Sequence, residues 1–597
     1  MCGIAGGIGA EVPLSVVGDM LTAIAHRGPD GRGEHEGDHV AIGAVRLSVV
    51  GGPSGHQPLY SADRSACIVF NGEIYNYREL RSELAGRGYV FTSQSDTEVV
   101  LALHLLDGPA SVGRLRGMYA FAISAGDSVF LARDPIGMKP LYLYQDQTAL
   151  YFGSEIKALL RVPGVRPALD PTALADNFLV GHPGGSATFL AGIRCLLPGE
   201  RLAARYADGR LRCESLRVVP HLSPDPCPLP DEPAERRART ALLQAVRSHW
   251  DGDERPALAL SGGVDSTLLA LLAGRPLDSG TVCESAASSD ATMARQVAGQ
   301  LGLRHEQVLL SPAGYAARIA DAVLIEEQPP ALGALPLYFL FERLARRGRV
   351  CVLGEGADEV FAGYPDHVDP AGYRQQYQDR LRRLTEVGLA PSAAALELVE
   401  LRSAGPAGAY QANLGSPLVR QHLEPVDKYS MACGLEVRLP YLDTEVYAAG
   451  LALTAGSRLG PAGTEPKRLP RRWLTDQYGP AAAAITAAPK QGFPASGIGL
   501  LRGFARYCEQ QLPERYLASH ELGHLYRAKY QLVLHDLFGY LFLEGKAARP
   551  EGFRLAEFIA ARRTPATQIR PAQTAHPPPA PAPASGDRNP VQAGEQP

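Results

Sequence analysis

The stretch Ala257-Leu258-Ala259-Leu260-Ser261-Gly262-Gly263-Val264-Asp265-Ser266-Thr267 decides the fold of the second half of the chain. Its apolar start predicts a buried strand, and residues 267–273 predict a helix. Two glycines between them let the backbone approach a phosphate closely, and a helix N-terminus offers unpaired N–H groups. Asp265 adds a hard oxygen ligand for Mg²⁺. The chain has no G-x-x-x-x-G-K-[ST], so this is a nucleotide-loop candidate of another kind, although a plain glycine-rich connection also fits the hexamer alone.

A second strand–turn–helix unit follows about ninety residues later. Residues 350–353 are apolar, and Gly354-Glu355-Gly356-Ala357-Asp358-Glu359 comes directly after them. Strands that alternate with helices predict a parallel α/β sheet. Taken alone, the acidic segment also fits a surface loop. Residues 370–560 have a mostly helical composition, so we expect helices added to this sheet.

The first 165 residues have a different pattern, with short apolar strands between Gly, Asp and Pro breakers. Helical periodicity appears at 77–85 and 97–106, which predicts an α+β domain. The predicted strands are 41–45, 66–70, 119–123 and 129–132.

Proline-rich stretches set the predicted boundaries. Six prolines fall between 220 and 233, where we place a linker (219–233) because neither a helix nor a central strand accepts them. The domains are therefore predicted at 2–218 and 234–563. The last 34 residues, 564–597, hold nine prolines and are expected to be disordered.

A cysteine stands at position 2, where removal of Met1 would make it the first residue. The thiol of an N-terminal cysteine can give its proton to its own α-amine, whose pKa is near 8. An Asn side chain and the next N–H, as at Asn71-Gly72, can stabilise an oxyanion. Arg46 and Asp96 could hold the two charges of an amino-acid substrate. Each feature alone also fits a chain start, a hairpin turn, a surface charge or a helix cap.

Taken in order, these features resemble the class II glutamine amidotransferases, which are N-terminal-nucleophile hydrolases. The resemblance implies an αββα sandwich in which Cys2 attacks the side-chain amide of glutamine and releases ammonia. It implies an oxyanion hole at Asn71 and Gly72. It also implies that glutamine is held by Arg46, Glu73 and Asp96. The motifs that carry it are Cys-Gly-Ile at 2–4, His-Arg-Gly-Pro-Asp at 26–30, Asn-Gly-Glu-Ile-Tyr-Asn at 71–76, Ser-Asp-Thr-Glu at 95–98, and the segments 132–142 and 152–159.

The second half resembles the PP-loop ATP pyrophosphatases, and the whole order of motifs resembles glutamine-hydrolysing asparagine synthetases. The further motifs are 354–364, 427–432, 436–443, 467–471 and 490–493. The resemblance implies that ATP and Mg²⁺ are required, with the metal held by Asp265 and Asp358. Glu355 would help to form the acyl-adenylate and admit ammonia, and Lys467 would neutralise phosphate charge. The implied ATP-binding residues are Leu260, Ser261, Gly262, Gly263, Asp265, Ser266, Leu353 and Gly354.

Two departures from that family pattern leave the acceptor open. Leu353 stands where the family usually has Ser, and Glu326-Glu327-Gln328 replaces Asp-Glu-Pro. The leading hypothesis is asparagine formation from aspartate, and the alternative is amidation of another carboxylate in a biosynthetic pathway. Cys2 disfavours a β-lactam-synthetase-like cyclase, and the 261–266 loop disfavours a phosphoribosyl-pyrophosphate amidotransferase. The remaining hypothesis is a binding protein without catalytic activity.

Composition limits the partners of the 597-residue chain. Lys and Arg total 59 against 63 Asp and Glu, a formal charge of −4, which argues against nucleic-acid binding. No apolar run is long enough for a membrane span and no secretory signal is evident, so a cytoplasmic location is expected. Nine cysteines form no C-x-x-C pair. The expected partners are glutamine, ATP and aspartate or another carboxylate, and a homodimer is compatible with the sequence.

Overall fold

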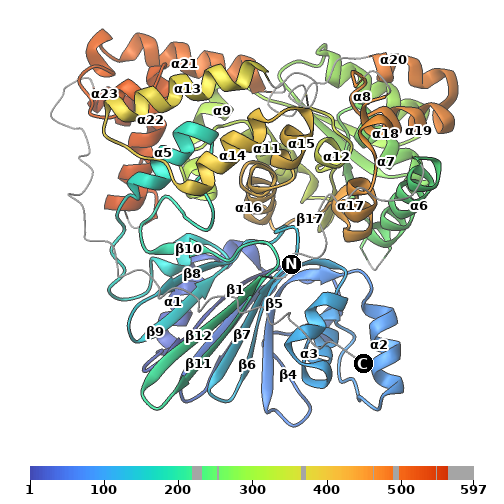
Figure 1. The fold of residues 1–597 in the computed structure, drawn as a ribbon, viewed down its shortest axis with the longest axis vertical. Helices are drawn as coiled ribbons and strands as arrows, with labels where there is room; N and C mark the ends of the chain where they lie inside the picture. The colour runs from blue at the N-terminus through green and yellow to red at the C-terminus, as the bar shows by residue number, and fades with distance from the viewer. Residues whose placement is uncertain are drawn as a thin grey trace, which may run out of the picture.

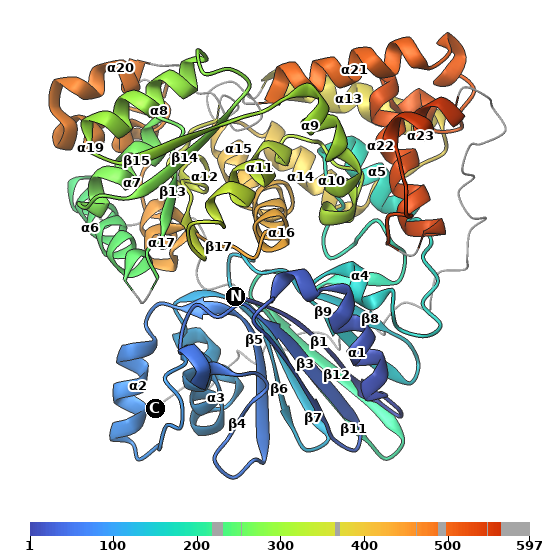
Figure 2. The ribbon, with the colours of Figure 1, turned by 180° about the vertical axis from the view of Figure 1, so that it is seen from behind.

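The computed structural model describes residues 1–217, 231–251, 254–364, 371–460, 463–487, 497–545 and 547–562. These form two stacked lobes, with antiparallel sheets below and a helix-rich lobe above (Figures 1 and 2). The predicted tail 564–597 and the motif 490–493 lie outside the described residues, as does the linker except for 231–233.

The lower lobe contains two six-stranded antiparallel sheets. The first has the order β10–β8–β9–β1–β3–β2. Its strands are β10 (Ile193–Cys195), β8 (Tyr142–Gln145), β9 (Ala149–Gly153), β1 (Cys2–Gly9), β3 (Val40–Arg46) and β2 (Gly31–Glu36). The second has the order β12–β11–β7–β6–β5–β4. Its strands are β12 (Arg210–Arg217), β11 (Glu200–Ala207), β7 (Ser128–Arg133), β6 (Gly117–Ala125), β5 (Ala66–Ile74) and β4 (Leu59–Tyr60).

The two sheets pack face to face, and helices cover both outer faces. Ile4 and Ile8 of β1 enter the core between the sheets with Val69 of β5, whereas Ala5 faces the other way. On that outer face lie α1 (Leu14–Ala23) and α4 (Ile156–Leu159). The second sheet is covered by α2 (Tyr77–Gly86) and α3 (Asp96–Asp107), which pack against Phe70 and Phe121. The predicted αββα sandwich is confirmed, and each of the four predicted strands lies within an observed one.

β1 is a strand that the sequence pattern did not predict. Its residues include four glycines, and glycine is depleted in strands. The reason for glycine is steric, because a Cβ at Gly6 would lie 2.7 Å from the Ala41 carbonyl oxygen, Ile42 and Phe152. Neighbouring segments therefore approach the backbone of β1 closely, and Cys2 stands at the start of a central, buried strand.

The upper lobe is built on a five-stranded parallel sheet of order β15–β14–β13–β16–β17. Its strands are β15 (Arg304–Leu309), β14 (Asp278–Cys283), β13 (Ala257–Ala259), β16 (Val350–Val352) and β17 (Glu436–Arg438). The helices that pack directly on these strands include α7 (Val264–Ala273), α8 (Ser289–Gln300) and α11 (Leu335–Leu344). The predicted parallel α/β sheet with added helices is confirmed.

Two helices begin before the boundaries that the sequence predicted for a helix or a domain. α7 starts at Val264 rather than Thr267, because Gly263 is already its N-cap residue. This places Asp265 and Ser266 in the first turn, beside the unpaired N–H groups. α6 (Asp231–Trp250) starts inside the predicted linker and includes Pro233. Proline is accepted there because the first turn makes no use of its missing N–H.

The remaining helices surround the parallel sheet. They are α5 (Pro171–Val180), α9 (Pro312–Ala317), α10 (Ile319–Glu326), α12 (Ala357–Val360), α13 (Ala371–Glu386), α14 (Ala393–Ser403), α15 (Pro406–Asn413), α16 (Glu424–Ala432), α17 (Thr444–Leu451), α18 (Ala455–Leu459), α19 (Arg468–Tyr478), α20 (Ala482–Ala487), α21 (Ile498–Gln511), α22 (Lys529–Phe538) and α23 (Leu555–Ala561). Among the helices of the described ranges, none has the length and apolar character needed to cross a membrane.

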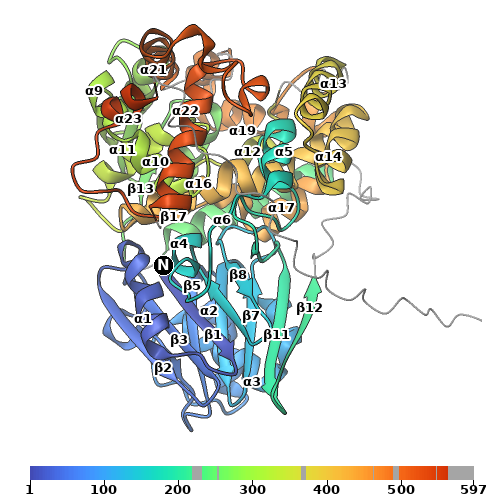
Figure 3. The ribbon, with the colours of Figure 1, turned by 90° about the vertical axis from the view of Figure 1, so that its left-hand side faces the viewer.

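One helix of the first half of the chain lies among those of the second. α5 packs against α13 and α14 of the upper lobe (Figure 3). Asp176 of α5 is fully buried, and its Oδ1 accepts a hydrogen bond of 2.7 Å from the Ser392 N–H at the start of α14. The two lobes are therefore joined by interlocked secondary structure as well as by side chains.

Candidate active sites

Cys2 is the first residue of β1, and Figure 1 marks the N-terminus at the junction of the two lobes. The register of β1 on β3 puts Cys2 directly opposite Arg46. Opposed residues of an antiparallel pair have Cβ atoms about 4.5–5.5 Å apart. Both side chains are buried, so the sheet register brings a thiol and a cation together away from bulk water.

Asn71, on β5 of the opposing sheet, contacts the same residue. The Cys2 N–H donates to Asn71 Oδ1 at 3.1 Å. Asn71 is fully buried, and within the described part of the chain its Nδ2 has no hydrogen-bond partner. The next position must be glycine, because a Cβ at Gly72 would lie 2.1 Å from the Met118 carbonyl oxygen. An unused amide donor beside the thiol is what an oxyanion hole requires.

Asp96, at the N-terminus of α3, lies in the same site as Cys2 and Arg46. Ser95 caps this helix by accepting from the Thr97 N–H, and Asp96 Oδ2 accepts from the Ile74 N–H at 3.0 Å. Burial raises the pKa of Asp96, and the chain-terminal ammonium and these N–H donors partly oppose that rise. Cys2, Arg46, Gly72 and Asp96 line one small cavity of about 20 Å³, and Met1 forms part of its wall.

Burial also raises the pKa of the Cys2 thiol. The chain-terminal ammonium and Arg46 oppose the rise because both stabilise a thiolate. A buried neutral thiol must lose its proton as it attacks, so the site needs an acceptor for that proton.

Two further residues of this cavity were not predicted. Gln57 Nε2 lies 3.5 Å from Cys2 Sγ. Glu436, on β17 of the upper lobe, also lines the cavity, and its Oε2 lies 3.4 Å from the Met1 nitrogen. Glu73 was predicted to bind glutamine, but it does not line this cavity, and its Oε2 lies 2.7 Å from Arg438 Nε. Glu73 therefore joins the lobes in this structure.

A buried ion-pair cluster lies directly behind Cys2. Arg27 Nε donates to the Cys2 carbonyl at 3.2 Å, and its Nη1 and Nη2 donate to Glu155 and Asp427, each at 2.8 Å. Lys139 Nζ donates to Asp427 Oδ1 at 3.1 Å. Burial alone would raise the pKa of Asp427, but Arg27 and Lys139 outweigh it and lower that pKa. The carboxylate on α16 is thus held ionised by two cations of the lower lobe.

The predicted nucleotide loop joins β13 to α7. Ser266 Oγ accepts from the Ser261 N–H at 3.2 Å, which closes the loop into a tight turn. Gly262 has φ +76°, and a Cβ there would lie 2.5 Å from the Ala294 nitrogen. Glycine is therefore required for both conformation and space. The α7 N-terminus and its first N–H groups face the end of the sheet, where anions bind readily.

The acidic segment after β16 lies beside this loop. A Cβ at Gly354 would lie 3.2 Å from Asp265 Cβ, so the two loops are in contact. Leu260 and Leu353 are the residues that follow β13 and β16, two adjacent parallel strands. Ligands of open α/β sheets bind outside such carboxyl ends. The structure therefore brings all the predicted ATP-site residues to one edge of the sheet.

Lys467 lies between the two predicted metal-binding carboxylates. Its Nζ lies 2.8 Å from Asp358 Oδ1 and also pairs with Asp265 Oδ2. Burial alone would lower the pKa of Lys467, but Asp265 and Asp358 outweigh it and raise that pKa above its usual range. Lys467 has φ +55° and precedes α19 directly. Two carboxylates so close together need positive charge, and their oxygen donors suit Mg²⁺.

Glu355 has a partner that was not predicted. His422 Nδ1 lies 2.9 Å from Glu355 Oε1, and His422 Nε2 lies 4.0 Å from Glu359 Oε1. His422 belongs to the π-helical turn η5 (Leu418–Leu423). Burial alone would lower the pKa of His422, but Glu355 and Glu359 outweigh it and raise that pKa to about 9. At neutral pH His422 is therefore an imidazolium that pairs with Glu355.

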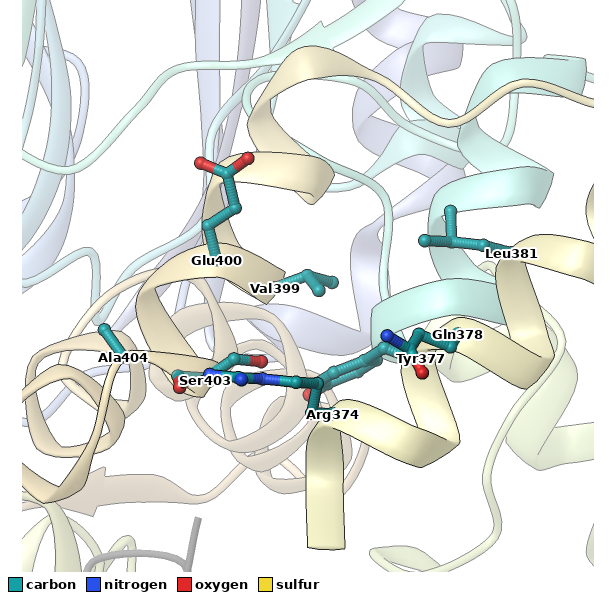
Figure 4. Close-up of a pocket in the computed structure, with 8 residues that line it drawn as sticks. All are labelled: Arg374, Tyr377, Gln378, Leu381, Val399, Glu400, Ser403 and Ala404. Carbon is teal, nitrogen blue, oxygen red and sulfur yellow. Dashed lines mark hydrogen bonds between the residues drawn. The ribbon is translucent and has the colours of Figure 1, made fainter. Parts of the chain in front are cut away.

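A separate cavity of about 330 Å³ lies between α13 and α14 (Figure 4). Leu381 and Val399 form part of its wall, and Arg374 closes one end by donating to the Ser403 carbonyl at 2.9 Å. It contains none of the predicted site residues.

Comparison with known proteins finds a family match for each half of the chain. Residues 1–214 match the family model of the glutamine amidotransferase domain, and residues 237–542 match that of asparagine synthase. A protein named asparagine synthetase [glutamine-hydrolyzing] 1 from Bacillus subtilis is 33% identical over 384 residues, which cover 62% of this chain and 60% of that protein. A putative asparagine synthetase [glutamine-hydrolyzing] from Mycobacterium bovis is 31% identical over 82% of this chain and 85% of its own length.

The same comparison finds proteins with a different name. Amidase chyE from Penicillium rubens is 32% identical over 59% of this chain and 56% of its own length. The match thus spans little more than half of some relatives and most of others.

Proposed function

Because this chain belongs to the asparagine synthase family and carries a glutamine amidotransferase domain before the synthase domain, we propose that it is an ATP-dependent amide-forming ligase that takes its nitrogen from glutamine. One observation carries the proposal. Two separately built sites occur in one chain, with Cys2 beside Arg46 and Asp96 in one lobe and Lys467 between Asp265 and Asp358 in the other.

Glutamine is cleaved in the lower lobe. Removal of Met1 makes the Cys2 α-amine available as the proton acceptor, and it also enlarges the cavity that Met1 lines. The Cys2 sulfur attacks the side-chain carbonyl carbon, and the oxyanion receives hydrogen bonds from Asn71 Nδ2 and the Gly72 N–H. The C–N bond breaks and ammonia leaves, giving a thioester that water hydrolyses to glutamate. Arg46 binds the substrate carboxylate and Asp96 its ammonium.

The acid is activated in the upper lobe. A carboxylate oxygen of the acceptor attacks the α-phosphorus of ATP, the bond to the bridging oxygen breaks, and pyrophosphate leaves. The N–H groups at the start of α7 and the Lys467 ammonium face the charge that develops on the phosphates. Asp265 and Asp358 would hold Mg²⁺, which would neutralise part of the same charge.

Ammonia then attacks the carbonyl carbon of the acyl-adenylate and expels AMP. The attacking nitrogen must lose a proton, and the Glu355 side chain, which is hydrogen-bonded to His422, could accept it. Ammonia is mostly ammonium in neutral water, so release and use within one protein preserve the neutral nucleophile. The contact of β17 with the Cys2 cavity supports such a shared interior.

Aspartate is the first acceptor to test, because the relatives described above include asparagine synthetases. The chain is incubated with ATP, Mg²⁺, glutamine and aspartate, and asparagine, AMP, pyrophosphate and glutamate are measured. Equal amounts of all four products support aspartate. Glutamate without aspartate-dependent pyrophosphate supports another carboxylate, the alternative favoured by Leu353 and Glu326–Gln328. If neither glutaminase nor acid-dependent ATP cleavage is detected, the proposal is wrong.

A further inference from the structure

A cavity of about 510 Å³ opens beside Glu355. Its wall is formed by the loop after α10, the start of α11, η5 and α22. Because Gly354 contacts the nucleotide loop and Glu355 lines this cavity, an acid bound here can present its carboxylate to a nucleotide at the sheet edge. The volume falls within the range of about 300–1,000 Å³ found for pockets that bury drug-sized ligands. It is therefore large for a four-carbon amino acid.

Most of the wall is apolar. Leu332 and Leu337 are buried on one side, and Leu534 is buried on α22. Tyr530 of α22 and Tyr526, which precedes that helix, add two aromatic rings. Apolar and aromatic walls of this kind favour ligands that bury carbon surface, at roughly 25 cal/mol per Å².

The cations of this wall already have partners. Arg420 Nη1 lies 3.2 Å from both oxygens of Glu424, and its Nη2 donates to the carbonyls of Gly185 and Ala187. His422 is bonded to Glu355. Within the described ranges, the lining therefore offers no uncommitted guanidinium or ammonium for the α-carboxylate of aspartate.

The wall also contains a second glutamate. Glu326 is buried and accepts a hydrogen bond of 2.7 Å from the Tyr429 hydroxyl. In either protonation state it offers no positive charge, and ionised it repels a second ligand carboxylate. A zwitterionic dicarboxylate would lose its hydration here without gaining an ion pair for its second carboxylate.

We propose that the acid activated beside Glu355 is a monocarboxylic acid with an extended, uncharged alkyl or aryl body that fills the cavity between α11 and α22. This inference rests on the proposed amide-forming function and names its acceptor class. The carboxylate end faces the nucleotide loop at the start of α7, and the body packs against Leu337, Tyr530 and Leu534.

The test is the acid-dependent exchange of labelled pyrophosphate into ATP by the full-length protein. Hexanoic and 3-phenylpropionic acid are compared with aspartate and with adipic acid, which has the hexanoic chain and a second carboxylate. We expect an exchange efficiency at least tenfold higher for the two monocarboxylic acids. Equal or higher exchange with aspartate overturns this inference and leaves the amide-forming function intact. No exchange with any acid overturns both.

A substitution in the cavity wall tests whether the preferred acids bind in this cavity. Ala334→Phe places a ring in the wall, and we expect it to raise KM for 3-phenylpropionic acid at least tenfold. Ala317→Phe, at the exposed end of α9, is the matched control and should change it less than twofold. Glutaminase activity reports folding, because the Cys2 cavity shares no residue with this wall. An unchanged KM in a variant that keeps its glutaminase activity contradicts the assignment of the acid to this cavity.

Discussion

Arg27 Nη2 lies 2.8 Å from Asp427 Oδ2, and this buried ion pair joins the lobe of Cys2 to α16 across 400 residues of sequence. The same guanidinium donates to the Cys2 carbonyl. Arg27 therefore contacts both the residue of the nucleophile and the upper lobe.

Asp427→Asn is expected to lower both the stability of the protein and the coupling between the two lobes. Removing one charge from a buried pair typically costs about 3–5 kcal/mol, because Arg27 and Lys139 lose their shared counter-ion. Unfolding in urea measures this loss. The amide formed per glutamate released should also fall, because the lobes no longer pack as one unit. Asp379→Asn, which removes a surface partner of Arg527, is the control and should leave both quantities nearly unchanged. Equal effects of the two substitutions would contradict this role of Asp427.

Cys2→Ala is expected to separate the two activities. Loss of the nucleophile should lower glutaminase activity by about 10³-fold or more. Amide formation from added ammonium should remain within about twofold, because the ATP site does not use the thiol. Cys213→Ala removes an exposed cysteine and should change neither rate. If a folded Cys2→Ala protein lost both activities, the two sites could not be separate.

Lys467→Met is expected to impair the ATP site and to spare glutamine hydrolysis, the reverse of Cys2→Ala. The substitution keeps the length of the side chain but removes the charge between Asp265 and Asp358, so pyrophosphate exchange should fall about 10²–10³-fold. Hydrolysis of glutamine in the absence of ATP should be nearly unchanged. Exchange at the normal rate would show that Lys467 does not face the phosphates.

The sequence predicted the parts of these sites that depend on local chemistry. The loop at Gly262 needs a positive φ, and Gly72 has no room for a side chain, so both positions carry glycine within short motifs. Cys2 opens β1, and Asp265 and Asp358 stand in the first turn of a helix, whereas Asn71 lies within β5. Alternation and helical periodicity predicted an α+β domain and a parallel sheet, and the family resemblance implied the αββα sandwich.

What the sequence could not predict depends on how distant segments pack. Glu436 reaches the Cys2 cavity only because β17 ends above β1, and His422 meets Glu355 only because a helical turn without any motif lies beside the loop after β16. Gln57 contacts Cys2 Sγ from an irregular segment. β1 itself was not predicted because glycine has a low strand propensity. Glycine is needed there because Ile42 and Phe152 approach the backbone closely.

His422→Gln is expected to change how stability depends on pH. The pKa of His422 is raised to about 9 in the folded protein against about 6.5 unfolded, so its contribution is fully present below pH 6.5 and is lost as the pH rises through 9. Burial raises the pKa of the neighbouring Glu359 to about 7, so the measurement is made between pH 7.5 and 9.5, above that titration. Glutamine can still donate to Glu355 but does not titrate.

Over that interval the unfolding free energy of the unsubstituted protein should fall by about 1–2 kcal/mol more than that of His422→Gln, a modest value because 31% of the imidazole is exposed. Urea midpoints at each pH measure the difference, and His524→Gln, on the surface, controls for the loss of any histidine. Amide formation should fall over the same interval only where His422 is present, because Glu355 then loses the cation that holds it in place. Parallel pH curves for the two proteins would show that His422 is neutral beside Glu355.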